Sequence, residues 1–134
     1  MSVYNGERYL REAEDSILQQ TFKDFEFLIV DDGSTDTSVV TIRSYSDKRI
    51  RLIVNETNVG LAASLNIGID CARGRYIARM DCDDISLPDR LEKQVAFLES
   101  HGDIGYAVAG LIFAVTGKTT YLASRVTMPR FGRA

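Results

Sequence analysis

A cluster of carboxylates is the part of this sequence best suited to chemistry. Asp81, Asp83 and Asp84 stand within four residues, directly after a segment with the pattern of a strand, residues 76–80. On an extended backbone, Asp81 and Asp83 point to the same side. Two carboxylates that close repel each other unless a cation lies between them, and such hard oxygen ligands suit Mg²⁺ or Mn²⁺. The spacing therefore predicts a divalent metal site, and the alternative is a solvated acidic turn.

Two further polar turns follow segments that have strand character. Asn5 comes shortly after residues 1–3, and Asp31 and Asp32 end the nearly continuous apolar run of residues 25–30. Such an apolar strand is typical of a parallel sheet that is buried on both faces. Parallel sheets bind ligands at the carboxyl ends of their strands, so these turns and the acidic cluster are expected to meet on one rim. A plain turn with a helix cap explains Asp31 and Asp32 equally well.

Alternating strand and helix patterns position these turns. Strands are predicted over residues 1–3, 25–30, 50–54 and 76–80, and amphipathic helices over residues 7–20, 37–45, 61–72 and 86–100. Ser86 and Asp89 resemble a capping box at the start of the last helix. The alternation predicts an α/β fold of three layers, α/β/α, with a mostly parallel sheet. Residues 106–115 and 119–122 are compatible with a further pair of strands.

Charge is distributed unevenly along the chain. The 134 residues have a net charge of −3, which argues against nucleic-acid binding. Residues 1–114 carry 12 Lys or Arg against 19 Asp or Glu, whereas residues 115–134 carry four basic residues and no acidic one. The chain is therefore divided into an acidic part, residues 1–114, and a basic C-terminal tail, residues 115–134.

Cysteine content and hydropathy bear on location. Cys71 and Cys82 lack a metal-binding spacing and are interpreted as free thiols in a reducing cytoplasm. The longest apolar run, residues 106–115, is too short to span a bilayer. A cytoplasmic protein without a membrane span in this chain is predicted, with a location at the inner face of the membrane as a variant of that prediction.

Three segments in order resemble the nucleotide-binding half of a family 2 glycosyltransferase with the GT-A, Rossmann-like fold. They are SVYNGERYLREAEDSILQQTFKDFEFLIVDDGSTDTS, NETNVGLAASLNIGID and GRYIARMDCDDISLPDRLEKQVAFLE, and the similarity runs from Met1 to about Ile104. The resemblance assigns residues 1–114 to binding of the nucleotide-sugar donor.

The resemblance also implies roles for individual residues. Tyr4 and Asn5 would lie against the nucleotide base and Asp32 on its polar edge, while Asp81 would bind the ribose or the metal and Asp83 the metal. The donor implied is a UDP-sugar, the metal is Mg²⁺ or Mn²⁺, and the acceptor is a hydroxyl of a glycan or a lipid-linked molecule. The implied reaction is an inverting transfer in which an Asp or Glu acts as general base.

The chain departs from the family pattern at both ends, so that the fold is expected to be truncated there. Fewer apolar residues precede Tyr4 than the first strand of the family has, and no Asp or Glu that could serve as the base follows Asp103. The chain is therefore expected to be a donor-side fragment with little activity alone. Two alternatives remain. One is a non-catalytic nucleotide-sugar-binding module. The other is a receiver-type domain in which Asp81 accepts a phosphoryl group, although such a domain needs a lysine on its final strand and Lys118 is expected in a turn.

Overall fold

A parallel sheet forms the centre of the molecule. The computed structural model describes residues 1–101, and within that range three strands pair in the order β1–β2–β3: β1 (Ser2–Val3), β2 (Phe27–Asp31) and β3 (Ile50–Val54). Val3 is in register with Asp31, which is in turn in register with Val54. The carboxyl ends of the three strands are therefore level, and the turns that follow them share one edge.

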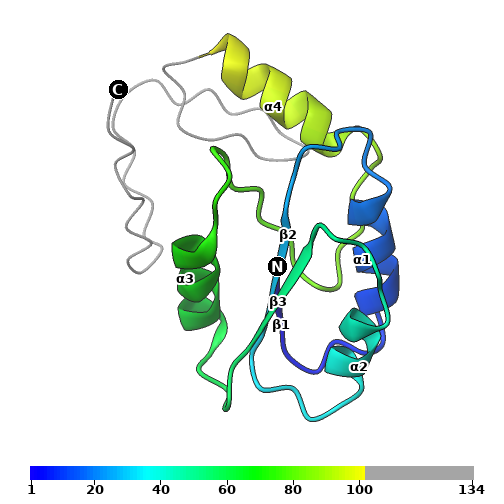
Figure 1. The fold of residues 1–134 in the computed structure, drawn as a ribbon, viewed down its shortest axis with the longest axis vertical. Helices are drawn as coiled ribbons and strands as arrows, with labels where there is room; N and C mark the ends of the chain where they lie inside the picture. The colour runs from blue at the N-terminus through cyan, green and yellow to red at the C-terminus, as the bar shows by residue number, and fades with distance from the viewer. Residues whose placement is uncertain (102–134) are drawn as a thin grey trace.

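Helices cover both faces of this sheet, as Figure 1 shows. The helices α1 (Leu10–Leu18) and α2 (Ser38–Arg43) lie on one face, and α3 (Leu61–Cys71) lies on the other. The fourth helix of the described range, α4 (Arg90–Ser100), lies beyond the other end of the sheet. This arrangement confirms the predicted three-layer α/β/α fold with a parallel sheet.

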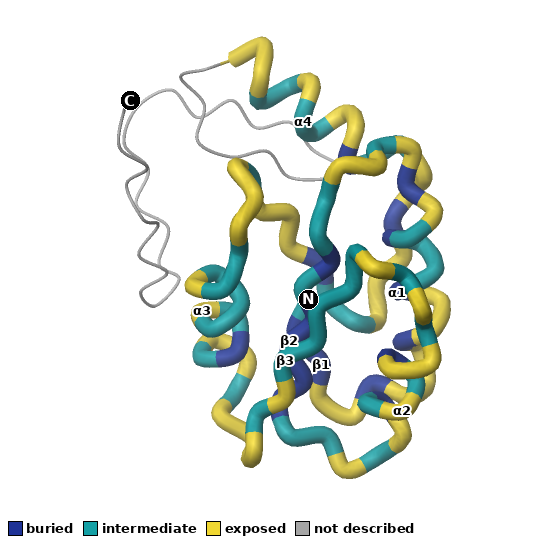
Figure 2. The backbone as a smooth tube through the Cα atoms, viewed as in Figure 1, coloured by how far each residue is buried: buried dark blue, intermediate teal, exposed yellow. Residues whose placement is uncertain are grey.

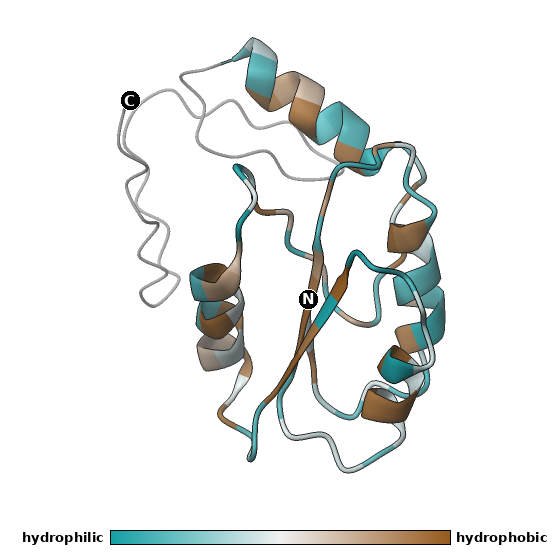
Figure 3. Cartoon of the chain, in the orientation of Figure 1, coloured by the Kyte–Doolittle hydropathy of each residue, from teal (hydrophilic) through white to brown (hydrophobic). Residues whose placement is uncertain are grey.

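The hydrophobic core lies between the sheet and α1. Alternate residues of β2, Phe27 and Ile29, point toward Leu10 and Ile17 of α1, and all four are buried in one cluster together with Val3, Ala13, Ile42 and Met80. Figure 2 shows the buried backbone concentrated in the sheet and in the side of α1 that faces it. Figure 3 shows the same division in hydropathy, since the strands are largely apolar and the helices are mixed. The core therefore holds the strand ends, and with them the polar rim, in fixed positions.

The prediction of a strand over residues 76–80 is wrong. These residues form no strand in the structure, although Met80 is buried in the core cluster beside Val3. The sheet edge at β1 consists of two residues, so it offers too few backbone groups for a longer ladder. Residues 76–80 do have the alternating pattern of a strand. In the structure, however, Met80 is buried in the core while the backbone of this segment forms no strand pairing.

Helix boundaries differ from those predicted by a few residues. The last described helix begins at Arg90 rather than Ser86, and Asp89 makes no side-chain capping hydrogen bond, so the predicted capping box is wrong. Ser86 is buried and its hydroxyl contacts the sulfur of Met80, which removes it from a capping role. Within residues 1–101, no helix is long and apolar enough to cross a membrane. The strands predicted after residue 105 and the basic tail, residues 115–134, lie outside the described residues.

Candidate functional site

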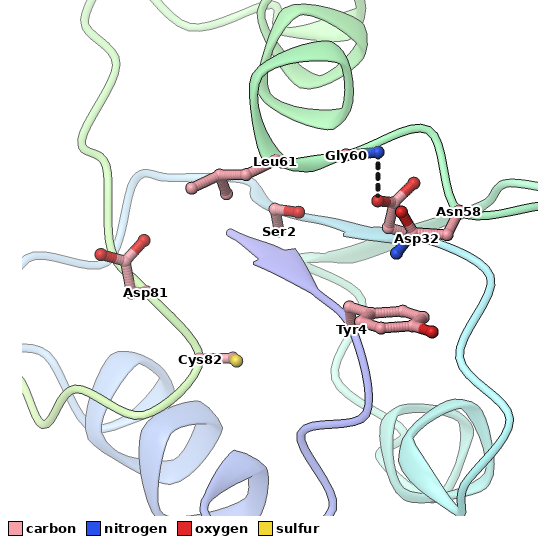
Figure 4. Close-up of a pocket in the computed structure, with 8 residues that line it drawn as sticks. All are labelled: Ser2, Tyr4, Asp32, Asn58, Gly60, Leu61, Asp81 and Cys82. Atoms are coloured by element: carbon pink, nitrogen blue, oxygen red, sulfur yellow. Dashed lines mark hydrogen bonds between the residues drawn. The ribbon is translucent and has the colours of Figure 1, made fainter.

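A pocket of about 500 Å³ opens at the carboxyl ends of the strands. Three of the residues with a predicted ligand role line it: Tyr4, Asp32 and Asp81. The other lining residues are Ser2, Asn58, Gly60, Leu61 and Cys82. In Figure 4, Asp32 and Asn58 lie at one end of the pocket and Asp81 lies at the other, with the Tyr4 ring along one side. The pocket therefore has two acidic ends separated by an apolar middle.

Asp32 is held rigidly at the end of β2. Its Oδ1 accepts hydrogen bonds from the Asn55 side chain and the Val59 N–H, both at 2.9 Å, and its Oδ2 accepts one from the Gly60 N–H at 2.8 Å. Burial raises the pKa of Asp32, but these hydrogen bonds together lower it more, so the net pKa lies below its usual value. Asp32 is thus a fixed carboxylate that also holds the loop before α3.

Asn5 does not line the pocket, because its side chain holds the neighbouring turn. Its Oδ1 accepts a hydrogen bond from the Thr35 N–H at 2.9 Å, and its own N–H donates to the Ser34 hydroxyl at 2.9 Å. Glu7 strengthens the same junction, since its Oε2 accepts from the Thr37 N–H at 3.1 Å. Asn5 has a φ of 51°, a conformation that asparagine tolerates better than most residues. Asn5 directly follows Tyr4 in the sequence and hydrogen-bonds the neighbouring turn. It therefore supports the backbone that carries the Tyr4 ring.

The acidic cluster is divided by the fold. Asp81 reaches the pocket, where Nη2 of Arg79 lies 2.7 Å from its Oδ1 and 2.9 Å from its Oδ2. Asp83 and Asp84 are exposed and do not line the pocket. Among residues 1–101 no group of three or more His, Cys, Asp or Glu side chains is placed to hold a metal ion. The donor chemistry of Asp81 and Asp83 still fits Mg²⁺ or Mn²⁺, because such ions use one or two protein carboxylates and take their other ligands from water and substrate phosphates.

Several lining residues were missed by sequence reasoning. Asn58 and Gly60 belong to the loop that follows β3, so they lie at the same edge as the other turns, although no ligand role was predicted for them. Cys82 lies between two aspartates and points into the pocket, where burial, followed by the charge of Asp83, raises the pKa of its thiol. The position of the loop after a strand was the signal that could have identified Asn58.

The two ends of this pocket suit different parts of a ligand. The half-exposed Tyr4 ring offers an apolar face for stacking, and Asp32 beside it accepts N–H hydrogen bonds. At the other end, Asp81 repels anions unless a cation lies between. The pocket therefore combines an aromatic face and a hydrogen-bond acceptor at one end with a carboxylate that favours a cation at the other.

Comparison with known proteins identifies the family. Residues 1–133 match Glycosyl transferase family 2, and the chain therefore belongs to that family. It is 52% identical over 104 residues to the putative glycosyltransferase EpsE of Bacillus subtilis, and the matched region covers 75% of this chain and 37% of EpsE. It is 45% identical over 117 residues to the uncharacterized glycosyltransferase MJ1057 of Methanocaldococcus jannaschii, which covers 84% of this chain and 40% of that protein.

Solved structures support the same assignment. Residues 1–349 of S. aureus TarS in complex with UDP-GlcNAc match with a TM-score of 0.72 and 30% identity, covering 75% of this chain and 30% of that 1–349 chain. The mannosyltransferase PcManGT of Pyrobaculum calidifontis, in complex with GDP-Man and Mn²⁺, matches with a TM-score of 0.68 and 26% identity, covering 72% of this chain and 30% of that one. The chain thus has the fold of these enzymes and spans 40% or less of the relatives described here.

Proposed function

We propose that this chain binds a nucleotide-sugar donor, in the first instance a UDP-sugar, for metal-dependent inverting transfer of the sugar to a hydroxyl of a glycan or lipid-linked acceptor. The observation that carries the proposal is the pocket that brings Tyr4, Asp32 and Asp81 together at the carboxyl ends of parallel strands. TarS in complex with UDP-GlcNAc and PcManGT in complex with GDP-Man and Mn²⁺ support the donor class and the use of a metal.

The base end of the pocket favours uracil or guanine. Both bases carry a ring N–H on the Watson–Crick edge, whereas cytosine and adenine present a ring nitrogen that accepts hydrogen bonds. Asp32 remains ionised because its pKa is low, so it accepts hydrogen bonds and donates none. A base stacked on Tyr4 with its N–H toward Asp32 would donate to that carboxylate. We therefore expect UDP to bind more tightly than CDP or ADP.

The acidic end is assigned to the ribose and the metal. Asp81 lines the pocket and would bind the ribose or the metal, and Asp83, which is exposed two residues later, would supply a second carboxylate to the metal. A bound Mg²⁺ or Mn²⁺ supplies Lewis-acid neutralisation of the charge that develops on the departing diphosphate. The residues of this chain bind and orient the donor, and the general base of the inverting reaction is not assigned to any of them.

Calorimetric titration with UDP, with and without Mn²⁺, tests the proposal. We expect Mn²⁺-dependent binding, tighter for UDP than for CDP, and a large loss of UDP affinity in Asp32→Asn, because the new amide would present a donor toward the base N–H in one orientation and lose backbone partners in either. Asp24→Asn is the control, since Asp24 is exposed and lies outside the pocket. A cooperatively folded chain that binds no UDP with Mn²⁺ present would refute the proposal.

A second candidate function is a non-catalytic nucleotide-sugar-binding module within a larger protein. It shares the pocket with the first proposal and differs only in whether sugar is transferred. Membership of the glycosyltransferase family sets aside the receiver-type alternative, whose lysine, Lys118, lies outside the described residues. Incubation with a UDP-sugar and a hydroxyl acceptor distinguishes a transferase from a non-catalytic binding module, because only the transferase would release UDP in proportion to the acceptor that is modified.

A further inference from the structure

The residues that line the pocket do not supply the positive charge that a bound diphosphate would need. Its lining contains two carboxylates, Asp32 and Asp81, and no Lys or Arg. A nucleoside diphosphate brings further negative charge to this site, and one divalent ion compensates only part of it. This inference rests on the proposed function, and it concerns which residue of the chain supplies the additional positive charge.

Arg79 is the described residue best placed to do so. Among residues 1–101 it is the basic residue whose side chain binds a carboxylate of the pocket, through Nη2 at 2.7 Å and 2.9 Å from the two oxygens of Asp81. The two residues are separated by one position in a non-helical segment, which lets their side chains point the same way. The guanidinium therefore lies at the acidic end of the pocket, where the metal is also expected.

The backbone of Arg79 is fixed while its side chain is exposed. Nη2 of Arg90, in the first turn of α4, donates to the Arg79 carbonyl at 2.6 Å, and Nη1 of Arg90 donates to the Ser86 hydroxyl at 2.8 Å. The side chain of Arg79 is 56% exposed and that of Asp81 is 43% exposed. The guanidinium can therefore move through solvent without any shift of the main chain that carries Asp81.

We propose that Arg79 neutralises Asp81 while the site is empty and moves to the diphosphate of the donor when metal and nucleotide bind. Asp81 cannot keep both its contacts with the guanidinium and a divalent ion, because the two cations would lie within a few ångströms of each other and repel. An ion pair this exposed is readily displaced, since such pairs contribute a factor of about five or less to an equilibrium. The released guanidinium then finds phosphate oxygens, whose geometry suits its planar set of donors.

Binding of Mn²⁺ without nucleotide tests the first half of the proposal. The free Mn²⁺ ion has a strong electron paramagnetic resonance signal, so titration of the folded chain gives its affinity directly. We expect Arg79→Gln to bind Mn²⁺ up to about five times more tightly than the natural chain, because the competing cation is gone. Arg75→Gln is the matched control: Arg75 is also exposed and ion-paired, with Glu99 at 2.8 Å, and its loss changes the net charge equally.

Nucleotide binding at saturating Mn²⁺ tests the second half. We expect Arg79→Gln to weaken binding of UDP about tenfold, the effect of one lost charge-assisted hydrogen bond, and to leave binding of uridine unchanged. The UDP affinity of Arg79→Lys should lie between those of the natural chain and Arg79→Gln, because lysine keeps the charge but loses the planar donor set. A purely structural role for Arg79 would instead affect UDP and uridine equally.

Each outcome has a defined meaning. Failure of the natural chain to bind UDP would overturn the proposed function, and this inference with it. If the natural chain binds UDP, three outcomes would overturn the inference alone. The first is an equal Mn²⁺ affinity in the natural chain and Arg79→Gln, and the second is no measurable Mn²⁺ binding in either. The third is that Arg75→Gln changes the Mn²⁺ and UDP affinities as much as Arg79→Gln does. Tighter Mn²⁺ binding with selectively weaker UDP binding supports it.

Discussion

Glu14 gives the stability of this protein an unusual dependence on pH. It lies in α1, is fully buried, and neither of its carboxylate oxygens has a hydrogen-bond partner. The nearby charged or titratable groups are Arg11 and Asp15 of the same helix and Tyr45 after α2, whose hydroxyl donates to Asp15 at 2.7 Å. Burial, opposed by Arg11 and reinforced by Asp15, raises the pKa of Glu14 from 4.5 to about 7. The folded protein thus favours the neutral acid.

The sign and size of the effect follow from that pKa. Because the folded state holds the proton more tightly than the unfolded state, the contribution of Glu14 to stability is full below pH 4.5 and is lost as the pH rises through about 7. Each pKa unit corresponds to about 1.4 kcal/mol, so the loss approaches about 3 kcal/mol at pH 8. This is a large share of the stability of a small domain, about 5–15 kcal/mol.

Urea denaturation of the natural chain and Glu14→Gln between pH 5 and pH 8 measures this directly. The glutamine has the same shape and cannot ionise, so its stability relative to the natural chain should rise by about 2.5 kcal/mol over this range. A constant offset between the two is expected from the buried amide and carries no information. Glu12→Gln, an exposed neighbour on α1, should show no such trend. A pH-independent difference for Glu14→Gln would refute the reasoning, since it would mean that Glu14 ionises equally easily in both states.

Two further predictions concern the positions that hold the site. Gln20 is fully buried and its amide links α1 to the first turn of α4, so Gln20→Ala should lower the free energy of unfolding by about 3 kcal/mol. The exposed Gln19→Ala should change it by less than about 0.5 kcal/mol, and similar losses for both would contradict the assignment. Gly33 has a φ of +73° and an added Cβ would lie 2.8 Å from the Thr57 carbonyl carbon, whereas Gly60 has a φ of +89° with open space around it. Gly60→Ala is expected to cost about 1 kcal/mol of the free energy of unfolding, measured by urea denaturation, and Gly33→Ala should cost more. The opposite order would show that the turn at Gly33 does not contact the loop at Thr57.

The sequence alone determined the order of the elements and the edge at which they present polar groups. The buried character of residues 25–30 and the amphipathic segments on either side are local properties, and they predict a parallel sheet covered by helices. Once the sheet is parallel, its carboxyl ends must share one edge. Tyr4, Asp32 and Asp81 could therefore be expected at one site before their distances were known, and the structure brings these three together.

The tertiary structure decided which of the candidate groups face the pocket. Asn5 and Asp83 have the same polar character as their neighbours, but Asn5 is used to hold the turn at Thr35, and Asp83 lies outside the pocket. The alternation of residues 76–80 predicts a strand, yet pairing depends on a partner edge, and β1 provides two residues. Burial of Glu14 likewise depends on neighbours that local patterns do not specify. Hydrogen bonds and ion pairs between distant elements form only after packing, so their partners had to come from the structure.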